Sequence, residues 1–148
     1  MGTWGISNYE NDTVQDWLSE IGGSINYKDV EPFLQKVLNE EEFIDDEESF
    51  ISLAALEWMA DSIESKSINE NNTDELLYTH IKSIHRTAKK ILNFKGHSEL
   101  RELWEESDEY EVWLNYQNNL IDNIKLFLQK VENKFRPPGT TWSLLNED

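Results

Sequence analysis

Apolar side chains recur along most of the chain at spacings of three and four residues, which is typical of helices with one buried face. The expected helices cover about 13–21, Asp29 through Leu38, about 47–64, Thr73 to just before Gly96, a short stretch from Ser98, and about 109–133. No stretch shows sustained period-two alternation, so we expect no strands beyond a short pairing of the two terminal arms. The sequence therefore predicts an all-α fold, a compact five- or six-helix single domain over residues 1–148.

The expected helix over 47–64 differs from the others because its apolar side chains surround almost the whole axis. A helix of this kind is one enclosed by other elements. The following helix is amphipathic, with Leu77 and Ile81 on one side and basic residues on the other. Those basic residues are Lys82, Arg86 and Lys89. We therefore expect a central third helix and a fourth helix whose basic face docks against an acidic face of the same molecule.

Three segments lack helical periodicity and are expected to be irregular. They are an N-terminal arm over 1–11, a mobile loop over 65–72 and a C-terminal arm over 136–148. The two arms carry Trp4 and Trp142, whose large rings we expect to anchor the arms against the helices.

The N-terminal run MGTWGISNYENDTVQDWL has an unusual composition. Asn11 and Asp12 are suited to cap the helix that follows, and Asp16, one turn later, can hydrogen-bond the arm. The Met-Gly-x-Trp-Gly start, leading into an Asn-Asp…Asp-Trp helix entry, resembles the opening of a bacterial family described as domain of unknown function 4259. The resemblance covers residues 1–18, with a weaker echo over 98–104, and it implies a family without implying a chemistry.

The composition excludes several classes of protein. The chain has no cysteine, which rules out disulfides, thiolate metal sites and cysteine nucleophiles. It also shows no secretory signal and no apolar run of membrane-spanning length. A soluble cytoplasmic protein is therefore expected.

The net charge of −17 narrows the choice of partner, because the acidic residues are clustered. One cluster surrounds Phe43 and comprises Glu40, Glu41, Glu42, Asp45, Asp46, Glu47 and Glu48. A second comprises Glu105, Glu106, Asp108 and Glu109. Such a field repels nucleic acid and anionic membranes, so we expect neither as a partner. It favours a basic protein, although an acidic surface can also serve solubility alone.

A third group of carboxylates is a candidate chemical site. Glu57, Asp61 and Glu64 lie at positions i, i+4 and i+7 and share one face of the third helix. Such a stripe can ligate a divalent cation or supply an acid–base pair. A simpler expectation is that it faces solvent or pairs with Arg86 or Arg101. With no Glu-x-x-His motif, nucleophile elbow or glycine-rich phosphate loop, we expect no enzyme, cofactor or metal.

Two functional hypotheses follow. The first is a non-enzymatic protein-binding module, best exemplified by a bacterial immunity protein that masks a basic nuclease-type toxin, with the two acidic clusters and Phe43 as its contact residues. The alternative is an enzyme or a small-ligand or metal-binding helical protein that uses Glu57 and Asp61. A blander possibility is an interaction protein whose partner is another helix. The sequence leaves open whether the basic residues of the fourth helix are paired internally or form an anion site.

Overall fold

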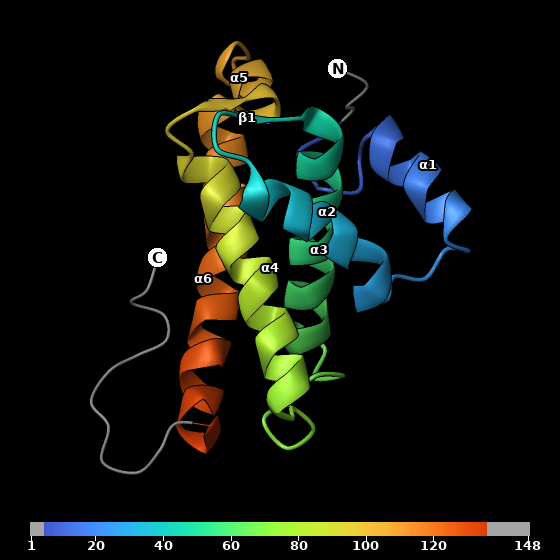
Figure 1. The fold of residues 1–148 in the computed structure, drawn as a ribbon, viewed down its shortest axis with the longest axis vertical. Helices are drawn as coiled ribbons and strands as arrows, with labels where there is room; N and C mark the ends of the chain where they lie inside the picture. Colours follow the sequence, from blue (N-terminus) through green and yellow to red (C-terminus); the bar gives the residue numbers. More distant parts are fainter. Residues whose placement is uncertain (1–4, 136–148) are drawn as a thin grey trace.

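The computed structural model describes residues 5–135, and within this range it contains six helices and one pair of very short strands (Figure 1). The elements are α1 (Asp12–Glu20), α2 (Tyr27–Asn39), β1 (Phe43–Ile44), α3 (Asp46–Glu64), α4 (Glu75–Asn93), β2 (His97–Ser98), α5 (Glu99–Glu105) and α6 (Tyr110–Phe135). The predicted all-α fold is confirmed. Trp4 and Trp142, and with them the expected anchoring of the arms, lie outside the described residues.

Helix α3 occupies the centre of the molecule, as its apolar circumference predicts. It contacts α1, α2, α4, α5 and α6, and α4 and α6 also pack against each other along its length (Figure 1). Every residue from Glu48 to Ala60 is buried except Trp58, which is half-buried. Burial of this continuous apolar surface is the main contribution to folding. None of the helices found over residues 5–135 has both the length and the apolar character that a membrane crossing requires.

Helix α4 begins one residue later than the sequence predicts. The side chain of Asp74 caps it by accepting a 2.8 Å hydrogen bond from the amide of Leu77. The expected cap, Thr73, is buried and donates its hydroxyl to the carbonyl of Asn69 at 2.7 Å instead. The preceding loop thus uses Thr73 to close on itself, which leaves the capping position to the next polar residue.

Helix α2 begins at Tyr27 with Asn26 at its N-cap position, three residues before the cap expected at Asp29. The ring of Tyr27 stacks on His80 of α4, with 3.6 Å between the ring centroids. This contact with another helix favours almost one additional turn that the sequence pattern does not show. Pro32 therefore lies beyond the first turn, at an exposed position.

One strand pairing that the sequence did not predict joins two internal segments, whereas the expected pairing of the terminal arms involves residues outside the described range. β1 and β2 run parallel, with Phe43 opposite His97 and Ile44 opposite Ser98. The amide of His97 donates to the carbonyl of Glu42 at 2.9 Å. Gly96 permits this approach, because a Cβ atom there would lie 2.5 Å from the carbonyl oxygen of Glu42.

We expect Gly96→Ala to lower the free energy of unfolding by about 1–3 kcal/mol, since the added methyl group forces the two strands apart. Chemical denaturation measures this loss. Lys95→Ala is the matched control, because Lys95 is the exposed neighbour and its truncation should change stability by less than about 0.5 kcal/mol. Equal stabilities of the two variants would show that the close approach does not matter.

Candidate functional site

The two acidic clusters lie at the same end of the molecule, uppermost in Figure 1. The first follows the link from α2 through β1 to α3, and the second follows α5 and its link to α6. They are held together because β1 pairs with β2, which leads directly into α5. The amide of Asp46 also donates to the carboxylate of Glu99 at 3.0 Å. The exposed carboxylates, which we call the acidic end, are Glu41, Glu42, Asp45, Glu47, Glu105, Glu106, Asp108 and Glu109.

Three residues of the first cluster depart from this exposed set. Glu40 and Asp46 are half-buried, and Glu48 is only 5% exposed. Burial, with repulsion from Asp45 and Glu40, raises the pKa of Glu48 to about 7. Glu48 is one of the contact residues expected from the sequence, but its buried side chain is not available to a partner.

Apolar side chains accompany the exposed carboxylates. Phe43 is 42% exposed, whereas its neighbour Ile44 is fully buried, because successive strand residues point to opposite sides. Val112, at the start of α6, is also exposed and follows the second cluster in the chain. The acidic end therefore combines charge with apolar surface.

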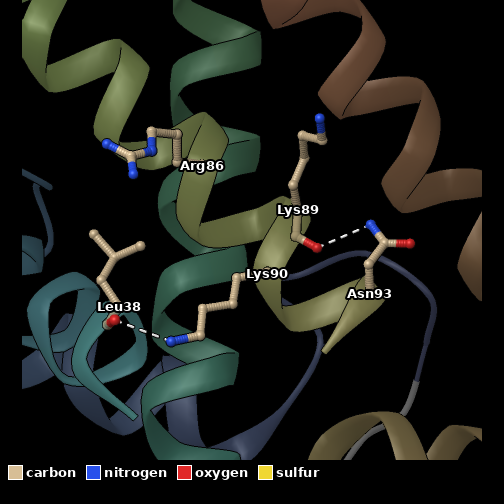
Figure 2. A pocket seen from close by; sticks show the side chains of 5 residues that line it. All are labelled: Leu38, Arg86, Lys89, Lys90 and Asn93. Carbon is tan, nitrogen blue, oxygen red and sulfur yellow. Dashed lines mark hydrogen bonds between the residues drawn. The ribbon is translucent and has the colours of Figure 1, made fainter. Parts of the chain in front are cut away.

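Two basic residues close to the acidic end, Lys90 and Arg101, bind backbone oxygens. The ammonium of Lys90 donates to the carbonyls of Leu38 and Glu40 at 2.9 and 2.6 Å, and so closes the C-terminal end of α2. The guanidinium of Arg101 donates to the carbonyls of Phe94 and Gly96 at 2.5 and 3.1 Å. Lys90 thus contacts carbonyl oxygens at the end of α2, next to the basic face expected from the sequence (Figure 2).

Arg101 also forms one ion pair, with Glu105 at 3.4 Å. Its other hydrogen bonds hold the link between α4 and β2 in place. Within the described part of the chain, the acidic end thus has many more carboxylates than cationic side chains that contact them.

The carboxylate stripe on α3 is divided between a buried and an exposed part. Glu57 is 6% exposed and accepts hydrogen bonds from the N-terminal arm, at 3.0 Å from the hydroxyl of Ser7 and 2.9 Å from the amide of Asn8. The expectation that the whole stripe faces solvent or pairs with arginine is wrong for Glu57. Asp61 and Glu64 are exposed.

The arm is fixed further by an amide pair. Asn8 and Gln117 of α6 exchange reciprocal side-chain hydrogen bonds of 2.9 and 2.6 Å, and both residues are buried. Asn11 donates to the carbonyl of Asn8 at 3.1 Å and caps α1 by accepting from the amide of Val14 at 2.8 Å. The predicted cap at Asn11 is thereby confirmed, and the same side chain also holds the arm.

The bond from α1 back to the arm comes from Gln15 and not from Asp16. The side-chain amide of Gln15 donates to the carbonyl of Tyr9 at 2.8 Å, whereas Asp16 is exposed. Adjacent residues of a helix point in different directions. The sequence spacing alone did not show that Gln15, and not Asp16, faces the arm.

Tyr9 and Tyr116 lie near the buried carboxylate of Glu57. Burial and the charge of Glu57 raise the pKa of Tyr116 to about 12. The same causes, with a contribution from Asp61, raise the pKa of Tyr9 above its ordinary value of 10.0. Both hydroxyls are therefore protonated at neutral pH, which suits hydrogen bonding more than acid–base catalysis. Over residues 5–135 there is no group of three or more metal-ligating side chains placed to hold a metal ion.

Comparison with known proteins gives one match. The family described as Domain of unknown function (DUF4259) matches residues 2–116, which extends from the N-terminal motif through α5 into the first part of α6. The resemblance inferred from the motif is confirmed and covers far more of the chain than the motif itself. No curated protein and no solved structure matches the chain.

Removal of the amide of Gln117 should leave the buried Asn8 side chain without its partner. We expect Gln117→Ala to lower the free energy of unfolding by about 1–3 kcal/mol. Asn115→Ala, at an exposed position of the same helix, should have little effect. A double-mutant cycle with Asn8→Ala should give a coupling energy of at least about 0.5 kcal/mol, and strict additivity would contradict the pair.

Glu48 should make stability depend on pH. Because its native pKa of about 7 exceeds the ordinary value of 4.5, the native state binds the proton more tightly than the unfolded state does. Its contribution to stability is therefore present below pH 4.5 and is lost as the pH rises through about 7. Unfolding at pH 5 and pH 8 should show Glu48→Gln gaining stability over the native protein at the higher pH only. Glu47→Gln is the exposed control, and an identical pH profile for both variants would refute this role.

Proposed function

The chain belongs to the DUF4259 family, whose description names no activity, and we propose that this member binds a basic protein through its acidic end. The observation that carries the proposal is the gathering of exposed carboxylates from two distant parts of the chain around the exposed ring of Phe43. No catalysis is part of this function.

A surface with one sign of charge steers an oppositely charged partner and raises the association rate by about 10–10³-fold. Steering alone gives little affinity, so a complex also needs a desolvated anchor, and aromatic side chains commonly supply it. Phe43 offers such an anchor among the charges.

The finer form of the proposal is an immunity protein that masks a nuclease-type toxin in a bacterial host. Nuclease sites hold phosphates with lysine and arginine side chains. Carboxylates presented on a rigid end can occupy the same side chains and block the substrate. The alternative site at Glu57 and Asp61 gains no support from the geometry, because both oxygens of Glu57 accept hydrogen bonds from the arm.

Affinity capture from the native lysate, with mass spectrometry as the readout, tests the proposal with two variants of equal net charge. The acidic-end variant carries Glu41→Lys, Glu42→Lys, Glu106→Lys and Asp108→Lys. The control variant carries Glu20→Lys, Glu31→Lys, Glu64→Lys and Glu70→Lys, all at exposed positions outside the acidic end. We expect one basic protein to be retained stoichiometrically by the native protein and the control, and lost from the acidic-end variant. Retention by all three proteins, or by none, would contradict the proposal.

The captured partner then allows a test of the anchor. Phe43→Ala should raise the dissociation rate and weaken binding by more than about 1 kcal/mol, with little change in the association rate. The acidic-end variant should instead lower the association rate and reduce its dependence on salt. Surface plasmon resonance at two salt concentrations separates these effects, and unchanged dissociation of the Phe43→Ala variant would exclude Phe43 from the interface.

A further inference from the structure

A small cavity lies where α1, α2 and α3 meet. Helices α1 and α2 each pack against α3 but make few contacts with each other (Figure 1). The cavity left between them has a volume of about 250 Å³. The residues that line it are Thr13, Asp16, Trp17, Glu20, Phe33, Glu47 and Ile51. Side chains from three helices therefore face one enclosed space.

Two aromatic rings form one wall of this cavity. The rings of Trp17 and Phe33 meet edge to face, with 6.3 Å between their centroids and an angle of 80° between their planes. Trp17 is only 6% exposed, so its indole is fixed within the core, and Phe33 is half-buried. Aromatic rings attract organic cations and cover the aliphatic carbons attached to them. Lys36 already places its ammonium 5.7 Å from the centroid of Phe33, although Lys36 does not line the cavity.

Three exposed carboxylates surround the aromatic wall. Asp16 and Glu20 are four residues apart and share one face of α1, where like charges at this spacing repel each other. Glu47 comes from the first turn of α3. Within residues 5–135, none of these three side chains takes part in an ion pair or a hydrogen bond. The other lining residues are uncharged, so the cavity carries three negative charges that no cation of the described chain contacts.

The aromatic wall and the carboxylates together determine the chemistry of a ligand. The carboxylates require a cation, and the rings favour an organic cation over a hydrated metal ion. A primary ammonium group has three N–H donors and no acceptor, which matches a site that offers only acceptors. The volume is below the range of about 300–1,000 Å³ that is usual for drug-sized ligands, so the ligand is small.

We propose that the cavity between α1, α2 and α3 binds a small aliphatic amine in its ammonium form. The carboxylates of Asp16, Glu20 and Glu47 hold the ammonium group, and the methylene chain packs against Trp17 and Phe33. Asp16, the motif residue that does not bind the arm, thereby gains a role. The proposal goes beyond the basic protein partner and does not rest on it.

Titration of the ¹⁵N-labelled protein with n-pentylamine at constant ionic strength, followed by NMR, tests the proposal. We expect saturable chemical-shift changes at the indole N–H of Trp17 and at amides within residues 13–20 and 47–51. Potassium ions and n-pentanol, which has the same chain without the charge, should not produce them. Changes spread equally over the acidic end, or no saturable change, would overturn the proposal.

A lysine side chain carries the same ammonium group, and Nα-acetyl-lysine methylamide distinguishes this source from a free amine. Its main-chain atoms add bulk that the small cavity does not accommodate, so it should bind more weakly than n-pentylamine. Tighter binding of the lysine derivative would assign the ammonium to a protein side chain and overturn the free-amine proposal.

Asp16→Asn should weaken binding of n-pentylamine at least about fivefold, because a charge-assisted hydrogen bond is lost. Asp122→Asn removes the same charge from an exposed position of α6 and should leave the affinity unchanged. Phe33→Leu keeps an apolar side chain without the ring and should weaken binding about two- to fivefold. Circular dichroism checks that each variant is folded. Equal weakening by the two aspartate substitutions would reduce the effect to net charge and refute a built site.

The variants of the capture experiment separate this proposal from the first. The acidic-end variant keeps every residue that lines the cavity, so it should bind the amine while it loses the basic protein. The control variant carries Glu20→Lys and should lose the amine while it retains the basic protein. Loss of the amine from the acidic-end variant alone would place the amine at the acidic end and contradict the proposed cavity.

Discussion

The buried carboxylate of Glu57 is the constraint around which the structure is arranged. It lies in the middle of a helix whose other buried residues are mostly apolar, and an ionised group is costly there unless hydrogen bonds replace water. The arm supplies those bonds through Ser7 and Asn8, and Asn8 in turn requires the amide of Gln117. One polar group thereby fixes the arm, α3 and α6 relative to one another, and Asn11 extends the same network to the start of α1. The segment that carries the family motif is therefore a structural element.

The sequence predicted the features that repeat over several turns and missed those that depend on a single contact. The apolar circumference of 47–64 was enough to place α3 at the centre, and Asn11 was recognisable as a cap. The β1–β2 pairing could not be predicted, because two residues carry no periodicity. Spacing showed that Glu57 shares a helix face with Asp61, but it cannot show which segment covers that face. The acidic clusters were evident in the sequence. Their location at the same end of the molecule and the burial of Glu48 depend on tertiary structure.

Acidic and basic residues are unevenly distributed along this chain. Lys90 and Arg101 lie where the acidic end meets α4, and both bind main-chain oxygens. Such contacts stabilise helix ends and links while leaving the neighbouring carboxylates charged. At physiological ionic strength, charges more than about 8 Å apart on the surface are largely screened from one another. The basic residues of α4 and the carboxylates of the acidic end can therefore coexist on one small molecule.

The pairing of Asn8 with Gln117 also constrains when the N-terminal arm can be fixed during synthesis of the chain. The two residues are 109 positions apart in the chain, and a ribosome adds about 5–20 residues per second. Asn8 is therefore synthesised roughly 5–20 s before Gln117, whose amide pairs with it. During that interval water must supply the hydrogen bonds of the Asn8 side chain that Gln117 later forms. A nascent chain halted before Gln117 therefore lacks the side chain that pairs with Asn8, and its N-terminal arm cannot yet be fixed to α6.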